Sequence, residues 1–268
     1  MPKKSKEQSL LWKATKATFK GIGRGTAAVF KYTSKKIKES EEKRELEKNP
    51  TYKAQPIFGE LKVLKKITGD FSSTEADIYN LSVIALIFGK RGSGKSALGF
   101  RILENIWNKT KRRCYVLGME STILPSWIGK VTNVNELKND SVVLVDEGAV
   151  SYSSRESMSS KNKELSKLMA IARHKDLTLI FVTQNTGMID KNILKLADIL
   201  LIKEGSLLQL EMERPEIKKF YEKTEKAFKN IKTNRKSLTY IIDSSFEGVI
   251  SFEPPSFWTA NISKNRAS

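Results

Sequence analysis

The chain has 268 residues and a formal net charge of +18, and 39% of its residues are hydrophobic. This apolar content can form a packed core, and the length fits one α/β domain with appendages, so the composition excludes a wholly disordered chain. One cysteine and one histidine exclude an internal disulfide framework and a Cys-rich zinc module, and they leave little room for a histidine-based metal site.

The positive charge is concentrated in two segments. Residues 1–38 contain eleven Lys and Arg against a single Glu, a net charge of +10. Residues 214–236 contain nine cations against three Glu, a net charge of +6. The rest of the chain carries only about +2, so partners with negative charge are expected at these two segments.

The first basic segment, residues 8–38, is predicted to form an amphipathic helix. On a helical wheel its lysines lie on one side and its apolar residues, including Trp12 and Phe19, lie on the other. Cations recur too often for a membrane span, which needs about 18 consecutive apolar residues. Residues 1–49 are therefore predicted as this helix and a charged linker, and residues 50–268 as the main domain, which is expected to end with a basic helix and closing strands.

Three interpretations of the N-terminal helix are open. It could lie in the plane of an anionic membrane surface, with its aromatic face inserted and its lysines at the headgroups. It could contact DNA phosphates through the lysines. It could also dock its apolar face on its own or a neighbouring subunit.

A phosphate-binding loop follows the first predicted strand of the main domain. Residues 82–88 are nearly all apolar, as expected for a central parallel strand. The next eight residues match GxxxxGK[ST] and lead into a predicted helix. Backbone amides of such a loop hold phosphates, Lys95 would reach the β- and γ-phosphates of ATP, and Ser96 would bind Mg²⁺. The predicted nucleotide-binding residues are Gly89, Gly92, Ser93, Gly94, Lys95 and Ser96.

Two carboxylates end the third predicted strand. Residues 114–117 form the second strand, and residues 142–145 form the third, which is followed by Asp146 and Glu147. Asp146 is predicted to hold Mg²⁺ through water, and Glu147 to orient and deprotonate the attacking water. The expected activity is therefore nucleotide hydrolysis.

The fourth and fifth predicted strands are residues 177–182 and 199–202. Gln184 follows the fourth, where an amide can hydrogen-bond the γ-phosphate or the lytic water. The alternation of strands and helices predicts an α/β fold with a parallel sheet and helices on both faces. Between strands three and four, Arg155 and Arg173 are candidates for an arginine finger, often supplied to a neighbouring subunit, with Arg173 preferred. Arg173 could equally be an ordinary cation at a helix C-terminus.

These motifs resemble the FtsK/HerA superfamily of P-loop ATPases. The resemblance is carried by the phosphate loop, Val-Val-Leu-Val-Asp-Glu at 142–147 and Ala-Arg-His-Lys-Asp-Leu-Thr-Leu-Ile-Phe-Val-Thr-Gln-Asn at 172–185, and it covers roughly residues 80–205. The chain is most similar to compact packaging ATPases of viruses and plasmids and to Zot-like morphogenesis proteins. The resemblance implies a RecA-like core, ATP and Mg²⁺, a hexameric ring, and motor action on DNA or a DNA–protein filament. The membrane-spanning helix usual in Zot-like proteins is not found in this sequence.

The second basic segment suits such a motor. Apolar residues recur at helical spacing in 217–231, so one face can pack on the core while the lysines face solvent and contact phosphates without reading bases. A charged surface helix that only aids solubility is the alternative. The sequence thus predicts an ATP-driven DNA packaging or translocation motor, and a membrane-associated assembly ATPase without DNA tracking is the alternative. The protein is expected in the cytoplasm, and association with the membrane periphery or with the virion is also compatible with the sequence.

Overall fold

The computed structural model describes residues 55–117, 119, 124–146, 158–189, 191–259 and 262, with the backbone alone for residues 158–165, 188 and 192. The N-terminal helix predicted from residues 8–38 lies outside the described residues, as do Glu147 and Arg155. The predicted domain boundary at residues 49 and 50 stays a prediction.

Strands and helices alternate through most of the described chain. The strands are β1 (Lys62–Gly69), β2 (Ile84–Phe88), β3 (Cys114–Leu117), β4 (Ile128–Val131), β5 (Val142–Asp146), β6 (Thr178–Thr183), β7 (Ile199–Ile202), β8 (Leu238–Ile242) and β9 (Phe246–Ser251). The helices are α3 (Phe71–Asn80), α4 (Lys95–Thr110), α6 (Met158–His174), α7 (Lys191–Leu196), α8 (Leu207–Met212) and α9 (Pro215–Phe228). Short 3₁₀ helices are η1 (Val134–Glu136) and η2 (Thr186–Met188).

The strands form one nine-stranded sheet in the order β1-β9-β8-β7-β2-β6-β5-β3-β4. The strands from β7 to β4 in this order pair in parallel, which confirms the predicted parallel sheet and each of its five predicted strands. The sheet is mixed, however, because β8, β9 and β1 extend it with antiparallel pairs. The chain therefore has an α/β fold of the P-loop NTPase kind with an antiparallel extension.

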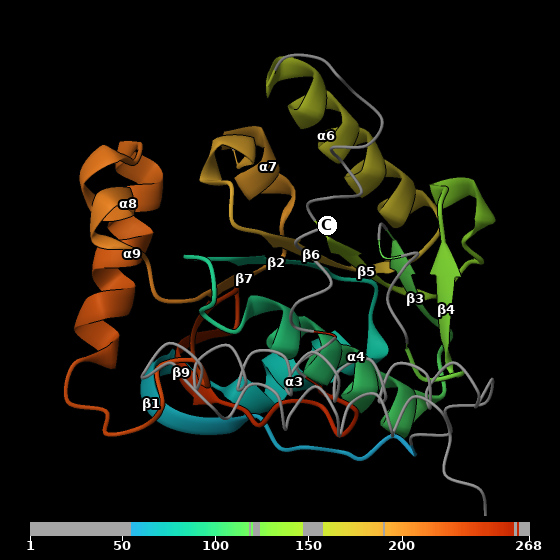
Figure 1. Ribbon diagram of the computed structural model, residues 1–268, viewed down its shortest axis with the longest axis horizontal. Coiled ribbons are helices and arrows are strands. Elements are labelled where there is room, and N and C mark those ends of the chain that lie inside the picture. The colour runs from blue at the N-terminus through green and yellow to red at the C-terminus, as the bar shows by residue number, and fades with distance from the viewer. Residues whose placement is uncertain are drawn as a thin grey trace, which may run out of the picture. The chain divides into compact units, whose positions relative to one another are not determined.

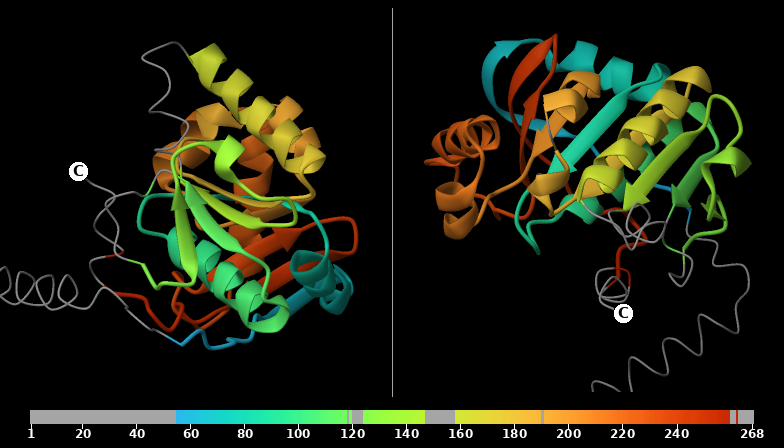
Figure 2. Two further views of the ribbon diagram at one scale, coloured as in Figure 1. Left: turned by 90° about the vertical axis from the view of Figure 1, so that its right-hand side faces the viewer. Right: turned by 90° about the horizontal axis from the view of Figure 1, so that it is seen from above.

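Helices cover both faces of the sheet, with α3 and α4 on one side and α6 and α7 on the other (Figure 1). Two further directions show the same layers (Figure 2). Strand β2 is central, and its side chains alternate between the two faces. Ala85 and Ile87 belong to the core under α4, whereas Leu86 and Phe88 belong to the core under α6 and α9.

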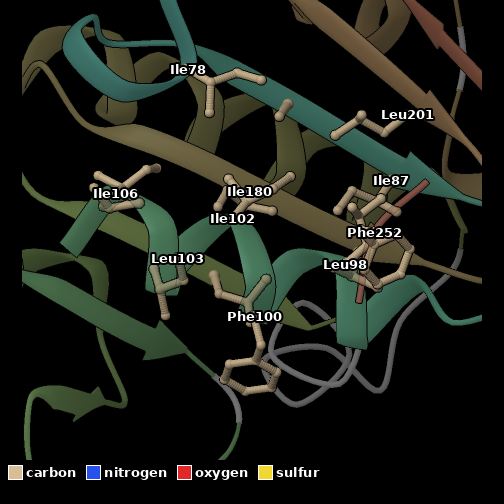
Figure 3. Packing of buried hydrophobic residues seen from close by; sticks show 14 of the residues in the cluster. Ile78, Ile87, Leu98, Phe100, Ile102, Leu103, Ile106, Ile180, Leu201 and Phe252 are labelled. Atoms are coloured by element: carbon tan, nitrogen blue, oxygen red, sulfur yellow. The ribbon is translucent and has the colours of Figure 1, made fainter. Parts of the chain in front are cut away.

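Helix α4 fixes the position of the loop that precedes it. Its buried apolar residues pack against Ile87, Ile180, Leu201 and Phe252, which come from three strands and the segment after β9 (Figure 3). At Gly99 the helix approaches β5 so closely that an added Cβ would lie 2.7 Å from a methyl carbon of Leu144. The start of α4 is therefore held at the edge of the sheet where the parallel strands end.

Two strands have no counterpart in the sequence-based prediction, namely β1 and β4. Strand β1 has a mostly exposed burial pattern, and β4 has only four residues. Both lie at the edges of the sheet, where one side of the strand has no partner strand and continuous apolar runs are not required. The pattern that revealed the buried strands is therefore absent from both.

Helix α9 confirms the amphipathic pattern predicted for the second basic segment. Pro215 occupies its first turn, where the missing N–H costs nothing. Its buried residues are Ile217, Tyr221, Thr224, Ala227 and Phe228, and the Tyr221 ring lies edge-to-face on Phe88 with centroids 5.8 Å apart. Lys219 and Lys226 are exposed on the opposite face.

Candidate active site

The predicted phosphate loop joins the end of β2 to the start of α4. Gly89, Gly92 and Gly94 have φ values of 146°, 77° and 92°, a region that favours glycine. Gly94 is the N-cap of α4 and provides no side-chain cap for the first helical amides. Backbone amides at a helix N-terminus, together with the helix dipole, form an anion-binding site. The loop thus has the backbone geometry that phosphate binding requires.

Three polar side chains, those of Ser93, Lys95 and Ser96, lie at the end of the loop and the start of α4. Lys95 is buried, and its Nζ donates hydrogen bonds to the carbonyls of Gly89 and Lys90 at 2.9 and 2.8 Å. The buried Ser93 hydroxyl has no hydrogen-bond partner among the described residues. Ser96, the second residue of α4, is half-buried. A buried ammonium and a buried hydroxyl at one loop suit an anionic, hydrogen-bonding ligand.

Two other predicted site residues, Asp146 and Gln184, lie at the same edge of the sheet as the phosphate loop. Strand β6 separates β2 from β5, and its register pairs Thr183 with Phe88 and Val182 with Asp146. Asp146 therefore ends β5 at the level where the loop begins, and Gln184 follows Thr183 between the two strands. The structure brings Gln184, Asp146 and the loop to one edge, while their chemical roles stay predictions. Glu147 follows Asp146 outside the described residues.

Ser96 and Asp146 could hold Mg²⁺ at this edge. Mg²⁺ usually takes one or two protein oxygens and completes its shell with phosphate oxygens and water, and one hydroxyl with one carboxylate fits that preference. Among the described residues, no cluster of three or more His, Cys, Asp or Glu side chains could hold a metal on its own. A metal at this edge would therefore depend on the nucleotide for most of its ligands.

Arg173 lies near the amino ends of the parallel strands, whereas the phosphate loop lies at their carboxyl ends. Its Nη2 donates to Asp198 Oδ1 at 3.1 Å and to the Leu196 carbonyl at 2.9 Å. Asp198 Oδ2 in turn accepts from the amide of Ile84, the first residue of β2, whereas the phosphate loop follows the last residue of β2. Within its own chain Arg173 is thus a full strand length from Lys95. Its predicted role as an arginine finger stays a prediction, and only the site of a neighbouring subunit could receive it.

The structure adds two residues that the sequence-based prediction missed, Lys203 and Glu204. They follow β7, the other neighbour of β2, and extend the pairing of these strands into the loop. The amide of Lys203 donates to the Phe88 carbonyl at 2.8 Å, and the amide of Lys90 donates to the Glu204 carbonyl at 2.9 Å. The Lys90 ammonium also pairs with the Glu204 carboxylate at 2.5 Å. In the sequence, Lys203 and Glu204 can be recognised only as polar residues at the end of a buried strand, which is also the position of Asp146.

Lys203 is fully buried beside the phosphate loop. Burial, together with the nearby charge of Lys95, holds the pKa of the Lys203 ammonium well below its ordinary value, and Glu204 partly opposes this shift. The ammonium groups of Lys90 and Lys95 outnumber the single carboxylate of Glu204 and leave an excess of positive charge at the loop, even without a charge on Lys203. Bound phosphate would offset that excess, which is a second physical reason to expect a polyphosphate ligand here.

Comparisons with known proteins agree with the resemblance to Zot-like proteins. Residues 119–205 match the family model described as Zonular occludens toxin (Zot). The matched part begins after the phosphate loop and contains β5, α6, β6 and β7. No curated protein matches the chain.

Several solved structures resemble the chain at low sequence identity. The genome packaging NTPase B204 from Sulfolobus turreted icosahedral virus 2, in complex with ATP-gammaS, has a TM-score of 0.39 and 18% identity over 65% of this chain and 98% of its own. The pCW3 conjugation coupling protein TcpA has a TM-score of 0.47 and 12% identity over 75% of this chain and 68% of its own. A KaiC-like protein from Pyrococcus horikoshii has a TM-score of 0.40 and 11% identity over 73% of this chain and 94% of its own.

Proposed function

We propose that this protein is an ATP-hydrolysing motor of a virus or plasmid that packages or translocates DNA. The observation that carries the proposal is the glycine-built loop on the central strand, with the buried Lys95 at its end and Asp146 and Gln184 at the same sheet edge. The match to the Zot family model over residues 119–205 supports the viral or plasmid setting that the sequence motifs imply. Assembly into a hexameric ring is part of the proposal.

Each side chain at the edge has a defined task in this proposal. Loop amides and Lys95 hold the β- and γ-phosphates, and Lys95 offsets the negative charge that develops on the transferred phosphoryl group. Glu147 takes the proton of the attacking water, and Gln184 orients that water or the γ-phosphate. Mg²⁺ held by Ser96 and Asp146 would supply further positive charge.

Helix α9 is the proposed DNA contact in the described part of the chain. Its buried face fixes it on the sheet, so its exposed lysines present a rigid row of positive charge. Lys223 pairs with Glu247 at 3.0 Å, whereas Lys219 and Lys226 form no salt bridge with any described residue. Lys219 and Lys226 are therefore the stronger candidates for contacts with phosphates.

The leading experiment measures ATP turnover by the full-length protein with and without double-stranded DNA. We expect Mg²⁺-dependent turnover that rises when DNA of any sequence is added, because phosphate contacts carry no sequence information. Turnover that no DNA changes would contradict the motor. No turnover under any condition would contradict hydrolysis as well.

Charge reversal on α9 tests the proposed DNA contact. The double variant Lys219→Glu with Lys226→Glu is expected to weaken DNA binding and to lower the salt-dependence slope by about 2, or roughly one per lost phosphate contact. Turnover without DNA should be unchanged. The double variant Lys130→Glu with Lys138→Glu, at two exposed lysines on and after the edge strand β4, changes the net charge equally and is the control for charge alone. Equal DNA binding by the α9 double variant and the control would exclude α9 as a contact.

The alternative is a membrane-associated assembly ATPase, and the basic amphipathic pattern of residues 8–38 favours it. No helix in the described ranges is long and apolar enough to span a bilayer. Flotation with anionic liposomes, comparing full-length protein with protein lacking residues 1–38, separates the two functions. Lipid binding by the full-length protein alone would support the alternative, and no lipid binding by either protein would exclude it.

A further inference from the structure

We propose that Lys203 is a positioning residue for the phosphate loop, because it ties the backbone of residues 236–239 to the glycines at both ends of that loop. The proposal rests on the nucleotide-binding part of the proposed function. It assigns Lys203 no contact with the nucleotide. Lys203 instead acts through the shape of the loop.

The first step of the argument is the contact between Lys203 and the start of the loop. A Cβ added to Gly89 would lie 2.7 Å from the Lys203 Cβ, closer than real Cβ atoms approach other atoms, and 3.0 Å from its carbonyl oxygen, which is closer than most real contacts. Gly89 therefore lies directly on the backbone and side-chain stem of Lys203. A shift of Lys203 would move the first glycine of the loop.

The second step concerns the end of the loop. A Cβ added to Gly94 would lie 2.4 Å from the carbonyl oxygen of Lys236. That oxygen also accepts a hydrogen bond from Lys203 Nζ at 2.9 Å. The ammonium of Lys203 thus holds a backbone carbonyl that packs against the N-cap residue of α4.

The third step is the extent to which the ammonium is engaged on that segment. Lys203 Nζ also donates to the Leu238 carbonyl and to Thr239 Oγ1, the latter at 3.2 Å, and it lies 4.7 Å from the centroid of the Phe252 ring. A buried ammonium on a long stem is expensive to desolvate, so a core with an apolar residue at this position would be simpler to stabilise. The three hydrogen bonds fix Lys236 and the start of β8 at the loop, which an apolar side chain could not do.

This arrangement has a consequence for coupling. Residues 229–235 connect the end of α9 to Lys236, which packs against the phosphate loop. A short stretch of backbone therefore links the basic helix to the loop. Movement of the loop on nucleotide binding or hydrolysis would act first on Lys203 and on residues 236–239. The basic helix lies directly before that segment in the chain.

The test is ATP affinity in the full-length Lys203→Met variant, measured by displacement of a fluorescent ATP analogue. Methionine keeps the stem and removes the ammonium, so we expect ATP to bind about 10- to 100-fold more weakly because the loop is no longer held in shape. Thr239→Val removes a single acceptor of Lys203 and should weaken ATP binding by a smaller factor. It also tests the proposal if Lys203→Met does not fold.

Asn105→Leu is the control for lost stability alone. Asn105 is fully buried on α4, far along the helix from the loop, and makes three hydrogen bonds to Gly59 and Tyr79. We expect it to lower the melting temperature while ATP affinity stays unchanged. Unchanged ATP affinity in Lys203→Met or in Thr239→Val, or an equal loss in Asn105→Leu, would overturn the proposal. Failure of the unaltered protein to bind ATP would instead overturn the proposed function.

Discussion

Lys95→Ala is expected to abolish ATP turnover and to weaken ATP binding. Lys95 supplies the buried positive charge that the proposed function places on the β- and γ-phosphates, and loss of one such preorganised donor costs about 10²–10³-fold in turnover. Lys203, the other lysine that is buried in the described part of the chain, cannot substitute for it because its ammonium is bound to residues 236–239. Steady-state turnover and displacement of a fluorescent ATP analogue measure the two effects.

The control for Lys95→Ala is Lys109→Ala on the same helix. Lys109 lies in the last turn of α4, where its ammonium is 4.4 Å from the centroid of the Phe58 ring. The Lys109→Ala variant should keep both turnover and ATP affinity. If Lys95→Ala hydrolysed ATP at a rate within a few-fold of that of the unaltered protein, the loop would not be the catalytic phosphate site. Among the described residues, no other buried cation lies at the end of a phosphate loop.

The parallel part of the fold could be predicted because burial on both faces forces a continuous apolar run. Each of the five strands predicted this way is present, and β2 and β6 are buried at every position. In the antiparallel extension, strand β1 could not be predicted from such a run. Strand β1 carries three lysines and is exposed along most of its length, as an edge strand can be.

The candidate site could likewise be predicted only in part. The loop and Asp146 could be found from the sequence because their residues are adjacent in the chain and follow a strand. Lys203 could not be found because its hydrogen-bond partners lie 33 to 36 residues further along the chain. A lysine after a strand is usually solvated, and only the close packing of β8 and the phosphate loop around it makes this one buried. Arg173 is a candidate because of its place at the end of a helix, and only its hydrogen bonds to Asp198 and Leu196 show that it lies at the other edge.

Glu147→Gln is expected to stop hydrolysis while ATP remains bound. The placement of Asp146 at the end of β5, level with the start of the phosphate loop, makes the next residue of the chain the proposed general base. Glutamine keeps the size and the carbonyl oxygen of glutamate but cannot accept a proton, so turnover should fall by about 10²–10⁴-fold. ATP affinity should stay near that of the unaltered protein, in contrast to Lys95→Ala.

The same carboxylate-to-amide change at Glu136 separates loss of the base from loss of a negative charge. Glu136 Oε1 accepts from the Asn133 amide at 2.9 Å in the capping box of η1, and glutamine can keep that hydrogen bond. Glu136→Gln should therefore leave turnover unchanged. If Glu147→Gln hydrolyses ATP as fast as Glu136→Gln, then Glu147 is not the base, and the proton of the attacking water must go to another acceptor at this edge. If Glu147→Gln loses ATP binding together with turnover, the carboxylate acts in binding ATP or Mg²⁺ instead of in proton transfer.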